Sequence, residues 1–343
     1  MSLRAAIDAA ISGVEVPGEV LEKAFGEIMD GKASPVQIAA LLIALRCKGE
    51  TVSEIVAAAT ALRARAVTAP IVDANAIDVC GTGGDGANSF NISTATAFVV
   101  AGAGVTVAKH GNRAASSKTG SVDVLESLGV HVDLPVEEAA RILREVGIAP
   151  FFARRAHPAM RFVAPIRSEL KFRTLMNCLG PLLNPMGVRL QLVGVYSPEL
   201  VEPLAEALGE LGAIRALVVH GSDGLDEITT RGRTEAALLE DGGVSPFSID
   251  PADLGIPPPL PGALRGGTAA ENAKIIRSLL DGERGARRDI VLINAGGALW
   301  VAGAATGIEE GMELARQSID SGAARERLEK LIVASGAGAR SDP

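Results

Sequence analysis

From residue 77 onward, short apolar runs alternate with stretches that have the composition of helices. In order along the chain, these segments are IDVC (77–80), STATAFVVAGAG (93–104), VTVAK (105–109), SVDVLESLG (121–129) and IAPFF (148–152). Further apolar runs at residues 190–196 and 214–220 flank a helical pattern at 198–211. Because parallel strands need crossover connections, usually helices, this alternation predicts an α/β fold with a central, mostly parallel sheet flanked by helices. Residues 242–267, rich in Pro and Gly, predict turns and short strands, and helices are expected to resume over residues 269–334.

The first 70 residues have helix-start signals and almost no strand pattern. Ser34 and Pro35 fit the N-cap and first position of a helix, and Thr51 with Glu54 fits a capping box before another. We therefore expect a small N-terminal helical domain over residues 1–70 and a large α/β domain over residues 71–343. The runs AALLIAL and EIVAAATAL contain more apolar surface than so short a region can bury alone, which favours association with a second copy.

Composition excludes several classes of protein. Three cysteines, far apart and each in an apolar segment, argue against a disulfide framework. Asp8 interrupts the stretch where a secretory signal would be apolar, and Asn294 and Thr306 dilute the longest apolar stretch, residues 290–308, so no signal peptide or membrane span is expected. A net charge of −8 argues against a general nucleic-acid binder, although residues 151–175 contain six Arg or Lys and one acid. A cytoplasmic protein with a local cationic surface is expected.

The segment GTGGDGANSFNIS (81–93) directly follows an apolar run and predicts an anion-binding strand-loop-helix. Gly81, Gly83 and Gly86 fit the G-x-G-x-x-G pattern of a dinucleotide site, but the next strand ends in Lys109 where an acid should bind the ribose. The spacing also fits a P-loop, but Ala87 and the residue after it replace the Lys and Ser or Thr that a P-loop needs. A tight turn without a ligand remains the alternative.

A second loop, KHGNRAASSKTGS (109–121), follows the second expected strand and brings a cation and hydroxyls to the same edge of the sheet. With the amide and hydroxyls of NIST (91–94), these donors favour a ligand that carries several phosphates and a sugar. Asp85 does not suit a phosphate cradle unless it faces sugar hydroxyls or a turn amide.

Four long segments resemble the anthranilate phosphoribosyltransferase family over nearly the whole chain. They are GTGGDGANSFNIST (81–94), KHGNRAASSKTGSVDVLESLGV (109–130), HPAMRFVAPIRSELKFRTLMNCLGPLLNPMG (157–187) and HGSDGLDEIT (220–229). The resemblance implies transfer of a phosphoribosyl group from 5-phosphoribosyl 1-diphosphate (PRPP) to the amine of anthranilate, with release of pyrophosphate and help from Mg²⁺. It also implies a helical domain, joined by a helical segment near residues 165–185, that hinges connect to the α/β domain, and a homodimer that contacts through the helical domain.

The resemblance also implies the site residues. Those implied for PRPP are Gly81, Gly84, Asp85, Ser89, Asn91, Ile92, Ser93, Thr94, Lys109, His110, Gly111, Asn112, Arg113, Ala114, Ala115, Ser116, Ser117 and Ser121. Those implied for anthranilate are Gly81, Asn112 and Arg167, and those implied for two Mg²⁺ ions per monomer are Ser93, Asp226 and Glu227. Ser89, Lys171 and Arg233 depart from the family pattern, in which Thr, Gly and Pro are expected. Lys171 is the departure expected to affect the helix or hinge beside the substrate channel.

The chemistry of this transfer agrees with the residues. Diphosphate leaves as an anion that Mg²⁺ can neutralise, so phosphate-binding loops, a cation and a metal are needed rather than a pair of acid and base carboxylates. An aromatic amine is neutral and needs orientation, so no dedicated base is predicted. His110 is available as a late proton acceptor, and the alternative is a structural role for it.

Three other functions remain in competition at this point. A nucleoside phosphorylase of the same fold would use phosphate instead of PRPP. A second alternative is a catalytically silent protein that binds nucleotides or nucleic acid. The Asp226–Glu227 pair and the acidic net charge argue against it. An NADP-dependent oxidoreductase with Lys109 on the 2′-phosphate would leave NIST and DGLDE without a role.

Overall fold

The computed structural model describes residues 2–70, 73–114 and 119–338. Its N-terminal region consists of the helices α1 (Ser2–Ile11), α2 (Gly18–Met29), α3 (Pro35–Lys48) and α4 (Val52–Arg63). Both expected helix starts are confirmed. The Gln37 N–H donates to Ser34 Oγ (3.3 Å) with Pro35 in the first turn, and the Glu54 N–H donates to Thr51 Oγ1 (3.3 Å) in a capping box.

The remainder of the chain forms an α/β unit around a seven-stranded sheet with the order β3-β2-β1-β4-β5-β6-β7. The first five strands in sequence are parallel, and β6 and β7 are antiparallel, which confirms a mostly parallel sheet. The strands are β1 (Ile77–Gly81), β2 (Val107–Gly111), β3 (Ile148–Phe152), β4 (Leu190–Gly194), β5 (Arg215–Gly221), β6 (Thr234–Glu240) and β7 (Gly243–Ile249).

The β6–β7 hairpin is a feature that the sequence analysis did not resolve, because residues 242–267 were expected to be turns and short strands. Asp241 and Gly242 connect the two strands with φ angles of 50° and 77°. An Asp-Gly pair is the residue pair that a tight two-residue hairpin turn favours, so this dipeptide is the signal that could have located the hairpin.

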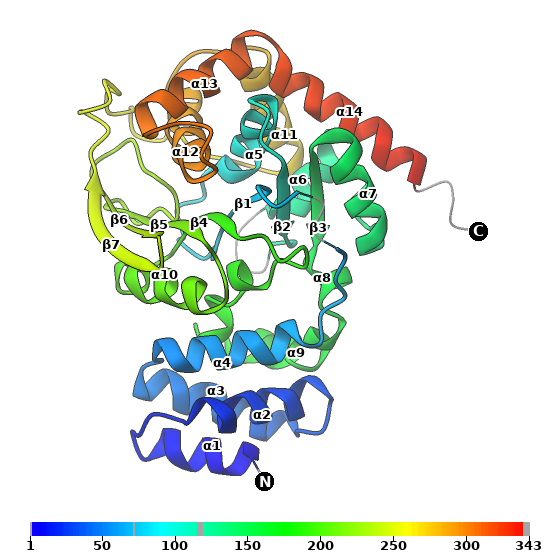
Figure 1. The fold of residues 1–343 in the computed structure, drawn as a ribbon, viewed down its shortest axis with the longest axis vertical. Helices are drawn as coiled ribbons and strands as arrows, with labels where there is room; N and C mark the ends of the chain where they lie inside the picture. Colours follow the sequence, from blue (N-terminus) through cyan, green and yellow to red (C-terminus); the bar gives the residue numbers. More distant parts are fainter. Residues whose placement is uncertain (1, 71–72, 115–118, 339–343) are drawn as a thin grey trace.

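Helices cover both faces of the sheet (Figure 1). On one face, α5 (Ile92–Gly102) and α12 (Ala286–Val301) pack on the central strands and share a core with the outer helices. On the other face, α10 (Val201–Glu210) lies between the sheet and α4. The outer helices are α6 (Ser121–Leu128), α7 (Val136–Val146), α11 (Ala269–Leu280), α13 (Ile308–Asp320) and α14 (Ala323–Gly338). No helix in the described ranges is both long and apolar enough to cross a membrane.

The N-terminal helices and the sheet share a second core, which includes Leu42 of α3, Val193 of β4 and Leu204 of α10. Arg63 at the end of α4 reinforces the contact, since its Nε donates to the Leu182 carbonyl (2.6 Å) and its Nη1 to the Leu211 carbonyl (2.8 Å). Short helices connect β3 to β4, and all of them except the first contribute to the same core. They are α8 (Ala153–Ala156), η1 (Pro158–Phe162), α9 (Ala164–Leu170), η2 (Leu175–Asn177) and η3 (Gly180–Leu183), and η4 (Pro198–Leu200) follows β4.

The strand order changes direction between β1 and β4, which are hydrogen-bonded neighbours. In open α/β sheets, ligands bind beyond the carboxyl ends of the strands at such a switch point. The glycine loop after β1, the second loop after β2 and the acidic turn after β5 all emerge at this edge. The fold therefore places the motifs of the sequence around one crevice.

Candidate active site

The glycine loop connects β1 to α5 through backbone conformations that favour glycine. Gly83, Gly84 and Gly86 have φ angles of 66°, 78° and 75°. No side chain caps the N-terminus of α5. Asn91, at the N-cap position, instead donates from Nδ2 to the Thr119 carbonyl (3.3 Å) and accepts from Asn272 Nδ2 at Oδ1 (2.9 Å). The backbone therefore shapes the loop, and Asn91 connects it to the second loop.

Asp226 enters the crevice from the turn after β5 and is held by the glycine loop. Its Oδ2 accepts a hydrogen bond from the Gly83 N–H (2.8 Å). A Cβ on Gly81 would collide with this carboxylate, and a Cβ on Gly194 would collide with the Asp226 carbonyl. Glycines at the ends of β1 and β4 are therefore required for the acid to occupy the switch point.

Three carboxylates converge here. Burial, together with the neighbouring charge of Asp85, raises the pKa of Asp226 to about 7. Burial and the charge of Asp226 raise the pKa of Glu227, while Lys109 opposes the shift. Glu227 Oε1 accepts a hydrogen bond from the Ser93 N–H (3.1 Å), and Asp85 Oδ2 is buried without a hydrogen-bond partner among the described residues.

This donor set fits a magnesium ion that arrives with a phosphorylated ligand. Oxygen ligands, mutual repulsion and an orphaned carboxylate oxygen all favour a bound cation. Within the described ranges, no three His, Cys, Asp or Glu side chains form a closed metal-binding group. Mg²⁺ commonly binds through one or two carboxylates, waters and substrate phosphates, so a partial set of ligands is what such an ion needs.

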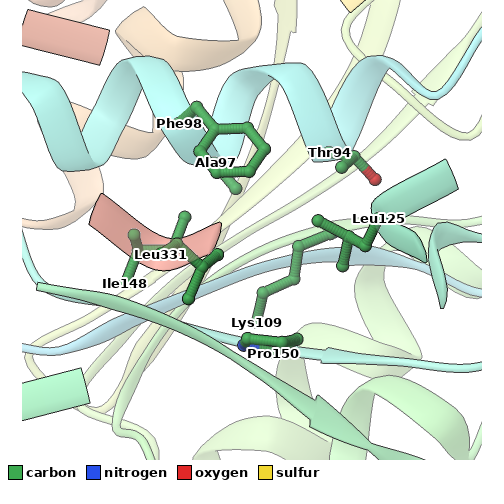
Figure 2. A pocket seen from close by; sticks show the side chains of 8 residues that line it. All are labelled: Thr94, Ala97, Phe98, Lys109, Leu125, Ile148, Pro150 and Leu331. Carbon is green, nitrogen blue, oxygen red and sulfur yellow. The ribbon is translucent and has the colours of Figure 1, made fainter. Parts of the chain in front are cut away.

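Lys109 is the cationic side chain of the site and lies beneath α5 (Figure 2). Its Nζ donates to the Val79 carbonyl (2.7 Å) and to Ser93 Oγ (3.3 Å), and the residue is only 4% exposed. Figure 2 shows its aliphatic stem in a small apolar pocket beneath α5, together with Thr94 of that helix. This pocket is core packing, because its lining is nearly all carbon. The ammonium of Lys109 contacts the crevice at Ser93, whose Oγ accepts its hydrogen bond.

Two residues expected at the phosphate site are buried. Thr94 is inaccessible, and Ile92 is 1% exposed with its N–H bonded to the Phe90 carbonyl (2.7 Å). Ser93, between them, is half-buried and lies against both Lys109 and Glu227. Of the three, Ser93 is the residue whose side chain lies among the charged groups of the site.

The second loop folds back onto α6. Arg113 pairs with Asp123 (3.0 Å) and Glu126 (2.7 Å), so its guanidinium is held by α6. Asp123 Oδ2 also accepts from the N–H groups of Ala114 (3.1 Å) and Gly120 (2.9 Å), and Ser121 Oγ donates to the Asn112 carbonyl (3.3 Å), next to Gly111 at the end of β2. Asn112 is exposed. Ala115, Ser116 and Ser117, also expected to bind PRPP, lie outside the described residues.

The segment from Leu264 to Gly267 supports both loops and was not expected to belong to the site. The Phe90 N–H donates to the Leu264 carbonyl (3.0 Å), and Ser89 pairs with Arg265 in an antiparallel bridge. Thr119 Oγ1 donates to the Gly267 carbonyl (2.9 Å). The Gly pair at 266–267 was the available signal, since a Cβ on Gly266 would collide with the backbone at residues 89–90.

Arg167 lies on α9, in the segment between β3 and β4. Its guanidinium has no hydrogen-bond or ion-pair partner in the described part of the chain, and burial lowers its pKa. Lys171, which replaces an expected glycine, ends α9 with a φ of 56°. This left-handed conformation explains the glycine preference at this position. A half-buried, unpaired guanidinium suits an anionic ligand.

His110 faces the interior. Its ring packs edge-on against that of His157, with centroids 5.3 Å apart, and burial lowers its pKa to about 3. Its backbone N–H donates to Asp78 Oδ1 (3.1 Å), and Asp78 also accepts from Asn184 Nδ2 (2.8 Å). This position favours the structural role over proton transfer.

The chain matches known proteins over nearly its full length. The family described as "Glycosyl transferase family, helical bundle domain" matches residues 4–66, and "Glycosyl transferase family, a/b domain" matches residues 73–325. The anthranilate phosphoribosyltransferase of Rubrobacter xylanophilus is 53% identical over 333 residues, 96% of each chain.

Solved structures agree. A crystal structure of anthranilate phosphoribosyltransferase from Thermus thermophilus has a TM-score of 0.91 and 42% identity, covering 97% of this chain and 99% of that chain. The Saccharomyces cerevisiae enzyme, in complex with PRPP and Mg, has a TM-score of 0.88 and 26% identity, covering 98% of each chain. The phosphate loops, the acidic pair and this full-length similarity together place the chain in the anthranilate phosphoribosyltransferase family.

Proposed function

We propose that this chain transfers the 5-phosphoribosyl group of PRPP to the amine of anthranilate, releasing pyrophosphate, as a step of tryptophan biosynthesis. The observation that carries the proposal is the position of Asp226, which meets the glycine loop at the switch point beside Lys109, Ser93 and Glu227. In this proposal the two loops bind PRPP, and Asp226, Glu227 and Ser93 provide oxygen ligands for Mg²⁺, with two ions per monomer. A magnesium ion there would neutralise charge on the departing diphosphate.

The chain's own residues bind and orient the substrates. Backbone groups of the glycine loop and of the start of α5 face the diphosphate, and Lys109 places a positive charge beside Ser93. Arg167 and Asn112 bind the anthranilate carboxylate and hold the neutral amine toward the sugar carbon. No side chain is required as a base, and His110 supports the end of β2 through Asp78 and His157.

A nucleoside phosphorylase is the second candidate for this fold, and the comparisons do not favour it. We also propose a cytoplasmic location, because Cys47, Cys80 and Cys178 are free thiols, which suit a reducing compartment.

A fluorescence assay tests the function directly. Purified protein should consume fluorescent anthranilate only when PRPP and Mg²⁺ are both present, because the diphosphate is both bound and activated at this site. A separate reaction with phosphate and a nucleoside, followed by release of the free base, tests the phosphorylase alternative. Anthranilate loss without PRPP, or phosphorolysis in place of transfer, would contradict the proposal.

Replacing both acids tests the metal role. The double variant Asp226→Asn with Glu227→Gln keeps size and hydrogen bonding but removes charge, so turnover should fall at least about a hundredfold and the Mg²⁺ dependence should change. Because the two buried carboxylates repel each other, the variant should also resist urea better than the native chain in the absence of Mg²⁺. Asp223→Asn, in the same turn, is the control. Near-native turnover with an unchanged Mg²⁺ titration would show that the pair serves only the loop.

Arg167→Ala tests anthranilate recognition. Loss of a charge-assisted hydrogen bond should raise the KM for anthranilate about ten- to a hundredfold, equivalent to about 1.5–3 kcal/mol, with a much smaller effect on the KM for PRPP. Asn112→Ala should act in the same direction and less strongly. The assignment of the two substrate sites is reversed if the KM for PRPP rises instead while that for anthranilate stays constant.

A homodimer through the helical region is the expected assembly. Val36, Ala40, Ile43 and Cys47 are spaced along one side of α3, and none of the four is buried, with Val36 78% exposed. Such a stripe is suited to cover a second copy. Sedimentation should therefore show a dimer at micromolar concentration, and Val36→Glu should weaken it. A native chain that sediments as a monomer would refute the assembly.

A further inference from the structure

Arg173 connects the segment after α9 to the glycine loop. Its Nη2 donates a hydrogen bond to the Gly84 carbonyl, and its guanidinium lies over the Tyr196 ring, 4.4 Å from the centroid. Tyr196 is itself tied to the loop, because its backbone N–H donates to Thr82 Oγ1 (3.0 Å). The guanidinium is thus fixed between a loop carbonyl and a ring that follows β4.

The hydrogen bond to Gly84 has a counterpart on the neighbouring residue. The Gly83 N–H donates to Asp226, which follows β5. The Gly84 carbonyl accepts from Arg173, which follows α9. Both glycines have left-handed φ angles, 66° and 78°, a conformation that glycine adopts readily. Two anchors on different elements therefore define the local shape of the loop.

The remaining surroundings of Arg173 come from other elements. Burial raises the pKa of Tyr196, and the charges of Glu50 and Arg46 also act on it. Both residues belong to the N-terminal helical region. Glu50 Oε1 is buried without a hydrogen-bond partner among the described residues. Arg173 therefore stands where the helical region, the segment after α9 and the glycine loop meet.

We propose that Arg173 is a positioning residue that fixes the glycine loop in the conformation that binds PRPP, although it does not contact the substrate itself. The inference rests on the proposed function, because it assigns PRPP to this loop. An arginine is suited to the role, since its planar guanidinium can donate to a carbonyl and stack on an aromatic ring at once, which a lysine cannot do.

Steady-state kinetics of three variants test the inference. Arg173→Ala should raise the KM for PRPP about five- to tenfold, with kcat within about threefold and an unchanged urea midpoint, because the exposed side chain orders the loop rather than the core. Arg173→Lys should behave like Arg173→Ala. Arg161→Ala is the matched control, because Arg161 lies in the same basic segment and over an aromatic ring, that of Phe162 at 4.7 Å.

The outcomes separate this inference from the proposed function. If the unsubstituted protein shows no PRPP-dependent turnover, the proposed function fails. If that turnover is present and Arg173→Ala leaves the KM for PRPP unchanged, the positioning role is overturned. Full recovery in Arg173→Lys, or an equal rise in Arg161→Ala, would attribute the effect to positive charge alone and also overturn it.

Discussion

The structure of the site depends on the half-buried Asp226 carboxylate at the switch point of the sheet. An ionised carboxylate in such a place is unfavourable unless it is hydrogen-bonded or paired, and the described residues give it one N–H donor, that of Gly83. Its pKa, raised to about 7, expresses that cost. Glycines at positions 81 and 194 are the steric condition for its presence. The fold thus keeps the Asp226 carboxylate at a position where its ionised form is unfavourable, and a diphosphate with its bound cation would stabilise that form.

Lys109 is the complementary element. Its ammonium is buried beneath α5 and is satisfied by one carbonyl and one hydroxyl, so its charge is not consumed by an ion pair with either acid of the site. Asp78, on the neighbouring strand, is instead bound by Asn184 and the His110 N–H. The two groups still interact, because burial raises the pKa of Asp78 to about 6 and the charge of Lys109 opposes that shift.

Sequence reasoning succeeded where a signal is local. Helix caps, the alternation of apolar runs and the positions of the glycine loop depend on residues within a few positions of each other. It did not extend to features that distant segments determine. Nothing near Phe90 indicates that Leu264 will pair with it, and nothing near Arg113 indicates that Asp123 and Glu126 will hold its guanidinium. Likewise, His110 packs against His157, which is distant in sequence. Lys171 is an intermediate case. The glycine that the family pattern expects at this position was the only hint of its left-handed φ.

The core shared with the N-terminal helices reaches both the strands of the site and α9. Val193 of β4 and Val218 of β5 pack in this core, and so does Ile166 of α9, the helix that carries Arg167. Arg63 connects that helical region to the α/β unit through the carbonyls of Leu182 and Leu211. The spacing between Arg167 and the glycine loop, which the proposed function assigns to the two substrates, therefore depends on how the helical region packs on the sheet. A substitution inside the helical region can alter the approach of the two substrates without contacting either of them.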